Sequence, residues 1–123
     1  MLSLGASHRY FLYREPTDMR KGFDGLSGLV RSELGQDPLS GDVFAFVNRK
    51  RDKMKLLLWD RSGFVVWYKR LEEGTFELPH GDAVSYPISW EKLMLILEGI
   101  ELKSVQKRKR YSRKKIIEKS VKK

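Results

Sequence analysis

Cysteine is absent from this chain of 123 residues, so neither a disulfide bond nor a thiolate metal site can form. The two histidines, His8 and His80, lie far apart and lack the short spacing of a histidine zinc site. The sequence also lacks a Gly-rich phosphate-binding motif and the nucleophile elbow of a hydrolase. We therefore expect no metal, no cofactor and no nucleotide hydrolysis.

Long hydrophobic runs are missing as well. No segment approaches the roughly 20 apolar residues of a membrane-spanning helix. The first residues lack the basic stretch followed by an apolar stretch that marks a secretory signal. We therefore expect a soluble cytoplasmic protein without a membrane partner.

Acidic residues are nearly absent from one end of the chain. Residues 103–123 contain eleven Lys or Arg and one Glu, a net charge of +10, whereas residues 1–102 have a net charge of −1. A run of like charges repels itself and typically binds polyanions. The sequence therefore predicts one folded domain over residues 1–102 and a basic tail over residues 103–123, flexible or helical on binding.

Hydrophobic residues make up 41% of the sequence, which is enough to build a core. Asp24 and Ser89 are the expected N-caps of two helices, and Gly35 and Gly99 are their expected ends. Apolar patterning predicts strands at 10–14, 42–48, 53–60 and 64–71, and a short strand within 74–87. This order predicts an α+β fold, a small antiparallel β-sheet of about four to five strands packed on two helices.

The segment DRSG, residues 60–63, gives the clearest hairpin signal in the chain. Asp at the first turn position and Gly at the fourth favour a three-residue loop closed by a glycine bulge. That loop would pair Leu57 with Trp67 and would place Trp59 and Trp67 on one face with Lys55. A two-residue turn would instead shift the pairing by one residue and exchange the faces of the second strand.

A basic cluster, NRKRDK at residues 48–53, lies between two apolar runs. Such a cluster can clamp phosphates, with exposed aromatic residues as stacking platforms for bases. The plainer alternatives are a solvated hairpin loop, tryptophans packed on a helix, and a solvated tail. The candidate nucleic-acid-binding residues are Arg20, Lys21, Arg49, Lys50, Arg51, Lys53, Lys55, Lys69, Arg70, Lys107, Arg108, Lys109, Arg110, Arg113, Lys114 and Lys115, and the candidate stacking residues are Trp59 and Trp67.

Catalysis has weaker support. Two aspartate pairs, Asp18 with Asp24 or Asp52 with Asp60, could in principle hold a divalent metal for phosphodiester cleavage. Arg20 follows Asp18 closely, however, and Asp52 lies among four cations. We therefore predict no catalytic residues and no metal site, with a metal-dependent nuclease subunit as an alternative.

Two segments carry a family resemblance: PTDMRKGFDGLSGLV at residues 16–30 and VFAFVNRKRDKMKLLLWDRSGFVVWYKRLEEGTF at residues 43–76. In this order and spacing they resemble the small second-reading-frame accessory protein, of the TnpB type, of the IS66 family of bacterial insertion sequences. That protein is distinct from the RNA-guided nuclease of the same name. The resemblance runs from Tyr10 to Phe76 and more loosely to Ile100, and it leaves the basic tail unmatched.

The resemblance implies a bacterial accessory protein of transposition that works beside a separate transposase, and it implies no catalytic residue. We expect a non-enzymatic protein that binds DNA backbone with weak sequence preference, the transposase, or both. The main alternative is a pure protein–protein adaptor for the transposase. The residues favour no particular oligomeric state.

Overall fold

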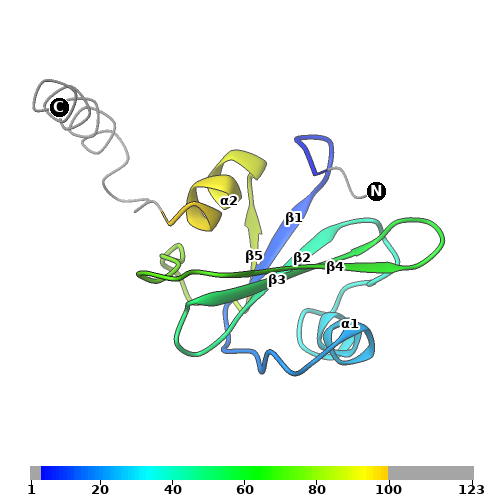
Figure 1. Cartoon of the computed structure of the whole chain (residues 1–123). Coiled ribbons are helices and arrows are strands. Elements are labelled where there is room, and N and C mark those ends of the chain that lie inside the picture. The colour runs from blue at the N-terminus through cyan, green and yellow to red at the C-terminus, as the bar shows by residue number, and fades with distance from the viewer. Residues whose placement is uncertain (1–3, 100–123) are drawn as a thin grey trace, which may run out of the picture.

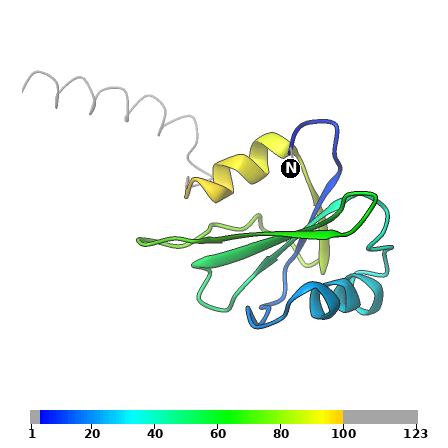
Figure 2. The ribbon, with the colours of Figure 1, turned by 45° about the vertical axis from the view of Figure 1, so that its right-hand side comes forward.

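The computed structural model describes residues 4–99, which form one sheet with a helix on each face (Figures 1 and 2). The elements in chain order are β1 (Tyr10–Tyr13), α1 (Phe23–Ser32), β2 (Val43–Val47), β3 (Lys53–Trp59), β4 (Phe64–Arg70), β5 (Ser85–Ile88) and α2 (Trp90–Leu97). The α+β prediction is confirmed. The predicted domain boundary at residue 102 and the basic tail lie outside the described residues.

The strands lie in the order β4-β3-β2-β1-β5 across the sheet. β1 and β2 are parallel, and all other neighbouring pairs are antiparallel. The sheet is therefore mixed, whereas the sequence pattern suggested an antiparallel one. The reason is the connection between β1 and β2, because it contains α1 and a helical crossover returns the chain to the end where β1 began.

The central strand β2 contributes to two separate cores, because successive side chains point to opposite faces of the sheet. Phe44 and Phe46 pack on the α1 side. Val43, Ala45 and Val47 pack on the α2 side. All five side chains are buried, so the loop that follows β2 starts from a rigid support.

The helix ends test two of the predicted caps. Ser89 is the N-cap of α2, and its hydroxyl accepts a hydrogen bond from the Lys92 backbone N–H at 3.1 Å. The prediction for α1 was wrong, because Gly22 is the N-cap and Asp24 lies inside the first turn. A carboxylate there still interacts favourably with the helix dipole. Neither helix within residues 4–99 has the length and apolar character that crossing a membrane requires.

The hairpin of β3 and β4 has a two-residue turn, so the expected glycine-bulge loop was wrong. The Asp60 backbone N–H donates to the Gly63 carbonyl at 3.0 Å, and Trp59 pairs with Phe64. Arg61, the first central residue, has a φ of +86°, as in the type II′ turns that match the twist of paired strands. The faces of β4 are therefore exchanged relative to the bulged register.

Candidate nucleic-acid interface

Asn48 organises the basic turn, residues 48–53, which joins β2 to β3. Its backbone N–H donates to the Lys53 carbonyl at 3.1 Å, and its own carbonyl accepts from Arg51 N–H at 3.0 Å. Its side-chain oxygen accepts from the backbone N–H groups of Asp52 and Lys53, both at 3.0 Å. Asparagine is suited to this position because its amide can replace backbone partners that the turn lacks.

The one carboxylate of the basic turn is engaged inside it. Asn48 Nδ2 donates to Asp52 Oδ1 at 2.6 Å. This hydrogen bond, helped by the nearby charges of Lys53 and Lys50, lowers the pKa of Asp52. Asp52 therefore stabilises the turn as a charged acceptor and does not stand free to hold a metal.

Two further hydrogen bonds brace the turn from the segment that follows β4. The Leu71 backbone N–H donates to the Asp52 carbonyl at 2.7 Å, and the Phe76 N–H donates to the Arg51 carbonyl at 2.6 Å. The Phe76 side chain is fully buried in the core on the α2 side. The backbone of the basic turn is thus held from within and from outside.

Three cationic side chains project from this fixed backbone. Arg49, Lys50 and Arg51 are exposed, and none of them takes part in the three ion pairs found within residues 4–99. Arg51 has a φ of +59°, a conformation that non-glycine residues adopt rarely and that the hydrogen bonds of the turn maintain. The result is a preformed cluster of positive charge.

The loop of residues 14–22 lies beside the basic turn (Figures 1 and 2). The Thr17 backbone N–H donates to the Val47 carbonyl at 2.8 Å. Lys55 Nζ donates to the carbonyls of Met19 at 2.7 Å and Lys21 at 2.9 Å. These contacts bring the two segments of the family resemblance together at one end of the sheet.

Lys55 was predicted to contact nucleic acid, and the structure gives it a different role. The residue is only 9% exposed, and its ammonium group lies 4.7 Å from the Tyr68 ring centroid. A buried ammonium needs acceptors, and the two loop carbonyls provide them. Lys55 therefore anchors the loop of residues 14–22.

Arg20 and Lys21 occupy this loop but differ in their surroundings. Arg20 makes a bidentate ion pair with Asp18, with a shortest N–O distance of 2.7 Å. The side-chain and backbone hydrogen bonds from Arg20 lower the pKa of Asp18 to about 2. The charge of Arg20 is therefore largely compensated, whereas Lys21 is exposed and has no ion-pair partner within the described part of the chain.

The two predicted contacts on β4 are also engaged within the protein. Lys69 Nζ donates to the Leu97 carbonyl at 2.7 Å and so caps the C-terminus of α2. Arg70 pairs with Glu72 at 2.8 Å on the surface. The cations that the structure leaves available at this end of the sheet are Lys21, Arg49, Lys50, Arg51 and Lys53.

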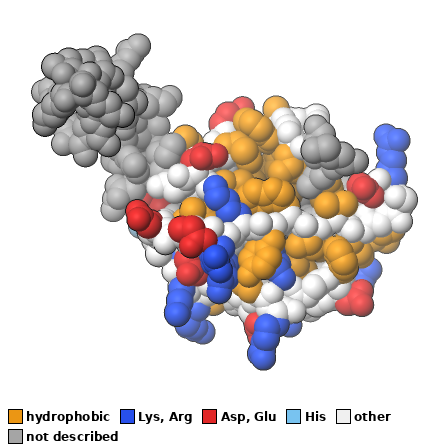
Figure 3. All heavy atoms as spheres, viewed as in Figure 1, with side chains coloured by type: hydrophobic (Ala, Val, Ile, Leu, Met, Phe, Trp, Pro, Cys, Tyr) orange, Lys and Arg blue, Asp and Glu red, His pale blue; other side chains and the backbone are white. Residues whose placement is uncertain are grey.

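Figure 3 shows how these charges are distributed. Lys and Arg side chains gather at the lower left of this view, over the end of the sheet that carries the basic turn. Acidic side chains lie among them, so this surface carries charges of both signs.

The two candidate stacking residues do not form a platform. Trp67 pairs with Leu56 and packs on the α2 side of the sheet. Trp59 pairs with Phe64, and the centroids of their rings lie 5.1 Å apart in an edge-to-face arrangement. This pair lies on the α1 side of the sheet, at the end of β3 opposite the basic turn. The prediction that both tryptophans share a face was wrong because it assumed the bulged register.

Three aspartates of the nuclease alternative, Asp18, Asp52 and Asp60, are engaged in hydrogen bonds within the protein. Within residues 4–99 no three His, Cys, Asp or Glu side chains form a cluster able to hold a metal ion. Asp18 is paired with Arg20, and Asp60 accepts hydrogen bonds from its own turn at Ser62 and Gly63. The predicted tail residues Lys107, Arg108, Lys109, Arg110, Arg113, Lys114 and Lys115 lie outside the described residues.

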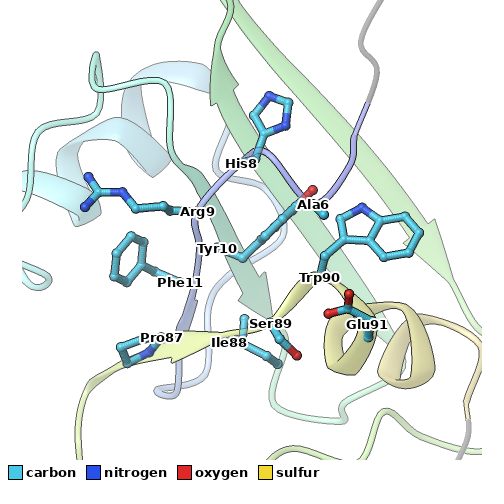
Figure 4. Close-up of a pocket in the computed structure, with 10 residues that line it drawn as sticks. All are labelled: Ala6, His8, Arg9, Tyr10, Phe11, Pro87, Ile88, Ser89, Trp90 and Glu91. Carbon is cyan, nitrogen blue, oxygen red and sulfur yellow. The ribbon is translucent and has the colours of Figure 1, made fainter.

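Sequence patterns gave no signal for a pocket of about 440 Å³ between the start of β1 and the start of α2 (Figure 4). Tyr10 lines it, and its hydroxyl accepts from the Gly5 backbone N–H at 3.0 Å and donates to the Gly5 carbonyl at 2.8 Å. His8 Nδ1 and Trp90 Nε1 are buried and lack hydrogen-bond partners among the described residues. The pocket lies away from the basic turn.

Comparison with known proteins identifies the family of the chain. The model of the family described as "IS66 Orf2 like protein" matches residues 8–107. The chain belongs to this family. Membership implies an accessory role in insertion-sequence transposition, which confirms the coarse functional expectation.

Two curated relatives come from Sinorhizobium fredii (strain NBRC 101917 / NGR234). The uncharacterized protein y4jC is 33% identical over 100 residues, which are 81% of this chain and 86% of the relative. The uncharacterized protein y4hO is 33% identical over 106 residues, which are 86% of this chain and 92% of the relative. No solved structure matches the chain.

Proposed function

We propose that this chain is a non-enzymatic accessory protein that holds nucleic-acid backbone with its basic turn and works beside the transposase. The observation that supports this most is the geometry of Arg49, Lys50 and Arg51. Hydrogen bonds fix the backbone of the turn, while the three charges stay in solvent. A preformed site loses little conformational entropy when it binds.

The chemistry of the site favours phosphate over bases. Lysine and arginine contacts to phosphate position a protein on nucleic acid without reading its sequence. Within residues 4–99, neither predicted stacking residue lies at the basic turn, since Trp59 and Trp67 pack elsewhere. The proposal therefore includes weak sequence preference and strong dependence on salt.

The test is binding to a short DNA duplex across a salt series, with the full-length protein and the variant Arg49→Ala/Lys50→Ala/Arg51→Ala. Each phosphate contact adds about 0.9 to the slope of log affinity against log salt concentration. We expect the variant to lose up to about 3 units of slope.

A matched control removes the same charge elsewhere. The variant Arg31→Ala/Arg61→Ala/Lys92→Ala takes one cation each from α1, the β3–β4 turn and α2. It should keep the slope of the wild type. Equal losses in both triple variants would show that net charge alone matters and would overturn the assignment to the basic turn.

Deletion of residues 103–123 separates the turn from the tail. If residues 1–102 still bind with a salt slope that the basic-turn variant removes, the folded domain holds the backbone. If binding needs the tail alone and ignores the turn, the proposal for the turn fails. Circular dichroism of each variant confirms that it is folded.

The acidic neighbours favour a second candidate, a protein adaptor for the transposase. Asp18 and Glu72 neutralise Arg20 and Arg70, which lowers the charge density of this edge. A co-purification of the chain with its transposase separates the two candidates. A complex that survives nuclease treatment and tolerates the basic-turn variant favours the adaptor.

The non-enzymatic part of the proposal has its own test. Purified protein, with and without the transposase, is incubated with single- and double-stranded DNA and magnesium or manganese. We expect no cleavage that depends on this chain. Metal-dependent cutting that disappears in Asp18→Ala would establish the nuclease alternative.

A further inference from the structure

The two edges of the sheet are protected to different degrees. Proteins usually guard an exposed strand edge with proline, charge, a bulge or a short strand. The edge strand β5 has four residues and contains Pro87. The other edge strand, β4, has seven residues, no proline and an unbroken pairing with β3. Within residues 4–99, no strand pairs with the outer side of β4.

The two cations of β4 do not guard its edge. Both lie at the end of the strand, and both have partners within the chain. Lys69 Nζ is bound to the Leu97 carbonyl on α2, and Arg70 is paired with Glu72. The centre of the strand, from Phe64 to Tyr68, carries no charge.

The register shows which backbone groups face outwards. Hydrogen bonds join Asp60 with Gly63 at one end of the hairpin and Asp52 with Leu71 at the other. Hydrogen-bonded and non-hydrogen-bonded pairs alternate along an antiparallel ladder, so these two ends fix every position between them. The residues whose backbone N–H and C=O groups point away from β3 are Phe64, Val66, Tyr68 and Arg70.

Hydrophobic side chains border this open edge on both faces. Tyr68 is 50% exposed, and Phe64, Val66 and Trp67 are each partly exposed. Figure 3 looks onto this edge and shows a band of backbone along β4 with hydrophobic side chains above and below it. An edge of this kind is a template for another strand.

We propose that two copies of this chain pair through β4, antiparallel and about a two-fold axis at Trp67. In this register Phe64 lies opposite Arg70 of the second copy, and Val66 lies opposite Tyr68 of the second copy. All four outward-facing residues of each strand then find hydrogen-bond partners, and the two sheets become one.

Self-complementarity argues for a second copy over an unrelated strand. Each cation of β4 meets an apolar residue of the other copy, Lys69 opposite Val65 and Arg70 opposite Phe64, so no like charges face each other. Moving the axis to Val66 would place Arg70 opposite Ser62 in the hairpin turn and would lose one pair within the strand. A two-fold contact buries the same patch on both copies, as most protein dimers do.

The dimer would also separate the two basic turns. Arg70 pairs with Lys53, so the basic turn lies at the C-terminal end of β4. Antiparallel pairing places the two basic turns at opposite ends of the joined sheet. The dimer itself does not depend on nucleic-acid binding.

The test is the mass of the full-length protein by sedimentation in high salt, which suppresses bridging by nucleic acid. The wild type should reach twice the mass of one chain as the concentration rises. The variant Val66→Lys/Tyr68→Lys places introduced lysines opposite each other across the axis and should remain a monomer. The variant Val66→Glu/Tyr68→Lys places an introduced glutamate opposite an introduced lysine and should restore the dimer.

The control is Leu39→Lys, which introduces one lysine at an exposed apolar residue outside β4 and should still dimerise. Thermal unfolding of each variant confirms that the monomer is folded. A wild type that stays monomeric overturns the proposal. This holds also if the β4 variants fail to bind the transposase, because β4 would then pair with the transposase and not with a second copy. A dimer that persists with both lysines present, or a Glu/Lys variant that stays monomeric, rejects this edge or this register.

Discussion

Lys55 illustrates how the surroundings of one residue determine its role. The same residue type in the basic turn projects into solvent as Lys50, whereas Lys55 is buried with its ammonium between two carbonyls. The difference comes from the strand, because position 55 points into the α1 side of the sheet where the loop of residues 14–22 covers it. The positive charge of Lys55 thereby holds this loop to the sheet together with the hydrogen bond from Thr17 to Val47.

The substitution Lys55→Met tests this role. Methionine has similar length and suits a buried site, but it leaves the carbonyls of Met19 and Lys21 without their donor. We expect the free energy of unfolding, measured in urea, to fall by about 1–3 kcal/mol. The control Lys50→Met should change it by less than about 0.5 kcal/mol. Equal stability of the two variants would contradict the anchoring role.

Asp18 gives a prediction for pH. Arg20 lowers the pKa of Asp18 from the ordinary 3.8 to about 2 in the folded protein. A lowered folded-state pKa adds stability that is present above the unfolded pKa and is lost as pH falls from there through about 2. In Arg20→Ala, the pKa of Asp18, followed by NMR titration of its carboxyl carbon, should rise towards 3.8. A pKa that stays near 2 in the variant would assign the shift to another group.

At the scale of elements, the hairpin turns depend on one side chain each. The Asn48 side chain accepts hydrogen bonds from backbone N–H groups of the basic turn, and the Asp60 side chain accepts hydrogen bonds within the β3–β4 turn. Both turns contain an arginine with positive φ, Arg51 and Arg61, where glycine or asparagine is more usual. The side-chain hydrogen bonds help to maintain these conformations.

The substitution Asn48→Ala should therefore weaken the whole β2–β3 connection. It removes acceptors for the N–H groups of Asp52 and Lys53 and the donor to the Asp52 carboxylate. We expect a loss of about 1–3 kcal/mol in the free energy of unfolding. Asn48→Asp keeps the acceptor oxygen but places a second carboxylate beside that of Asp52. The stability of this variant should therefore lie between those of the wild type and Asn48→Ala. A neutral effect of Asn48→Ala would show that the backbone contacts of Leu71 and Phe76 suffice.

At the scale of the whole molecule, one sheet serves two cores. Leu26 of α1 and Leu93 of α2 are both fully buried, on opposite faces. Each core needs the strands that the other core also uses. The domain should therefore unfold as one unit, as most small domains do.

Shortening one buried side chain in either core tests whether the two cores unfold together. Leu26→Ala and Leu93→Ala should each lower the free energy of unfolding by about 2–5 kcal/mol. Tryptophan fluorescence and far-UV circular dichroism should report one coincident transition in both variants. The two losses should add in the double variant, because the sheet separates the two sites. Separate transitions in either variant would show that one layer unfolds alone.

The sequence by itself determined the fold class, the Ser89 cap, the buried character of β2 and the family. These features depend on local patterns, such as apolar runs, a capping hydroxyl and two motifs in fixed order, which exist before the chain folds. The place of the basic turn between two strands also followed from the apolar runs on either side of it.

Only the tertiary structure decided the β3–β4 register, the parallel pairing of β1 with β2 and the hydrogen-bond partners of Lys55 and Lys69. A one-residue shift in the turn costs little locally but exchanges every side chain of β4 between faces, so Trp67 could not be placed from sequence. The partners of Lys55 and Lys69 are backbone carbonyls that lie 34–36 and 28 residues away, respectively, and no local pattern marks them. Which cations remain available for phosphate is therefore a property of the folded chain, because packing determines where each charge can go.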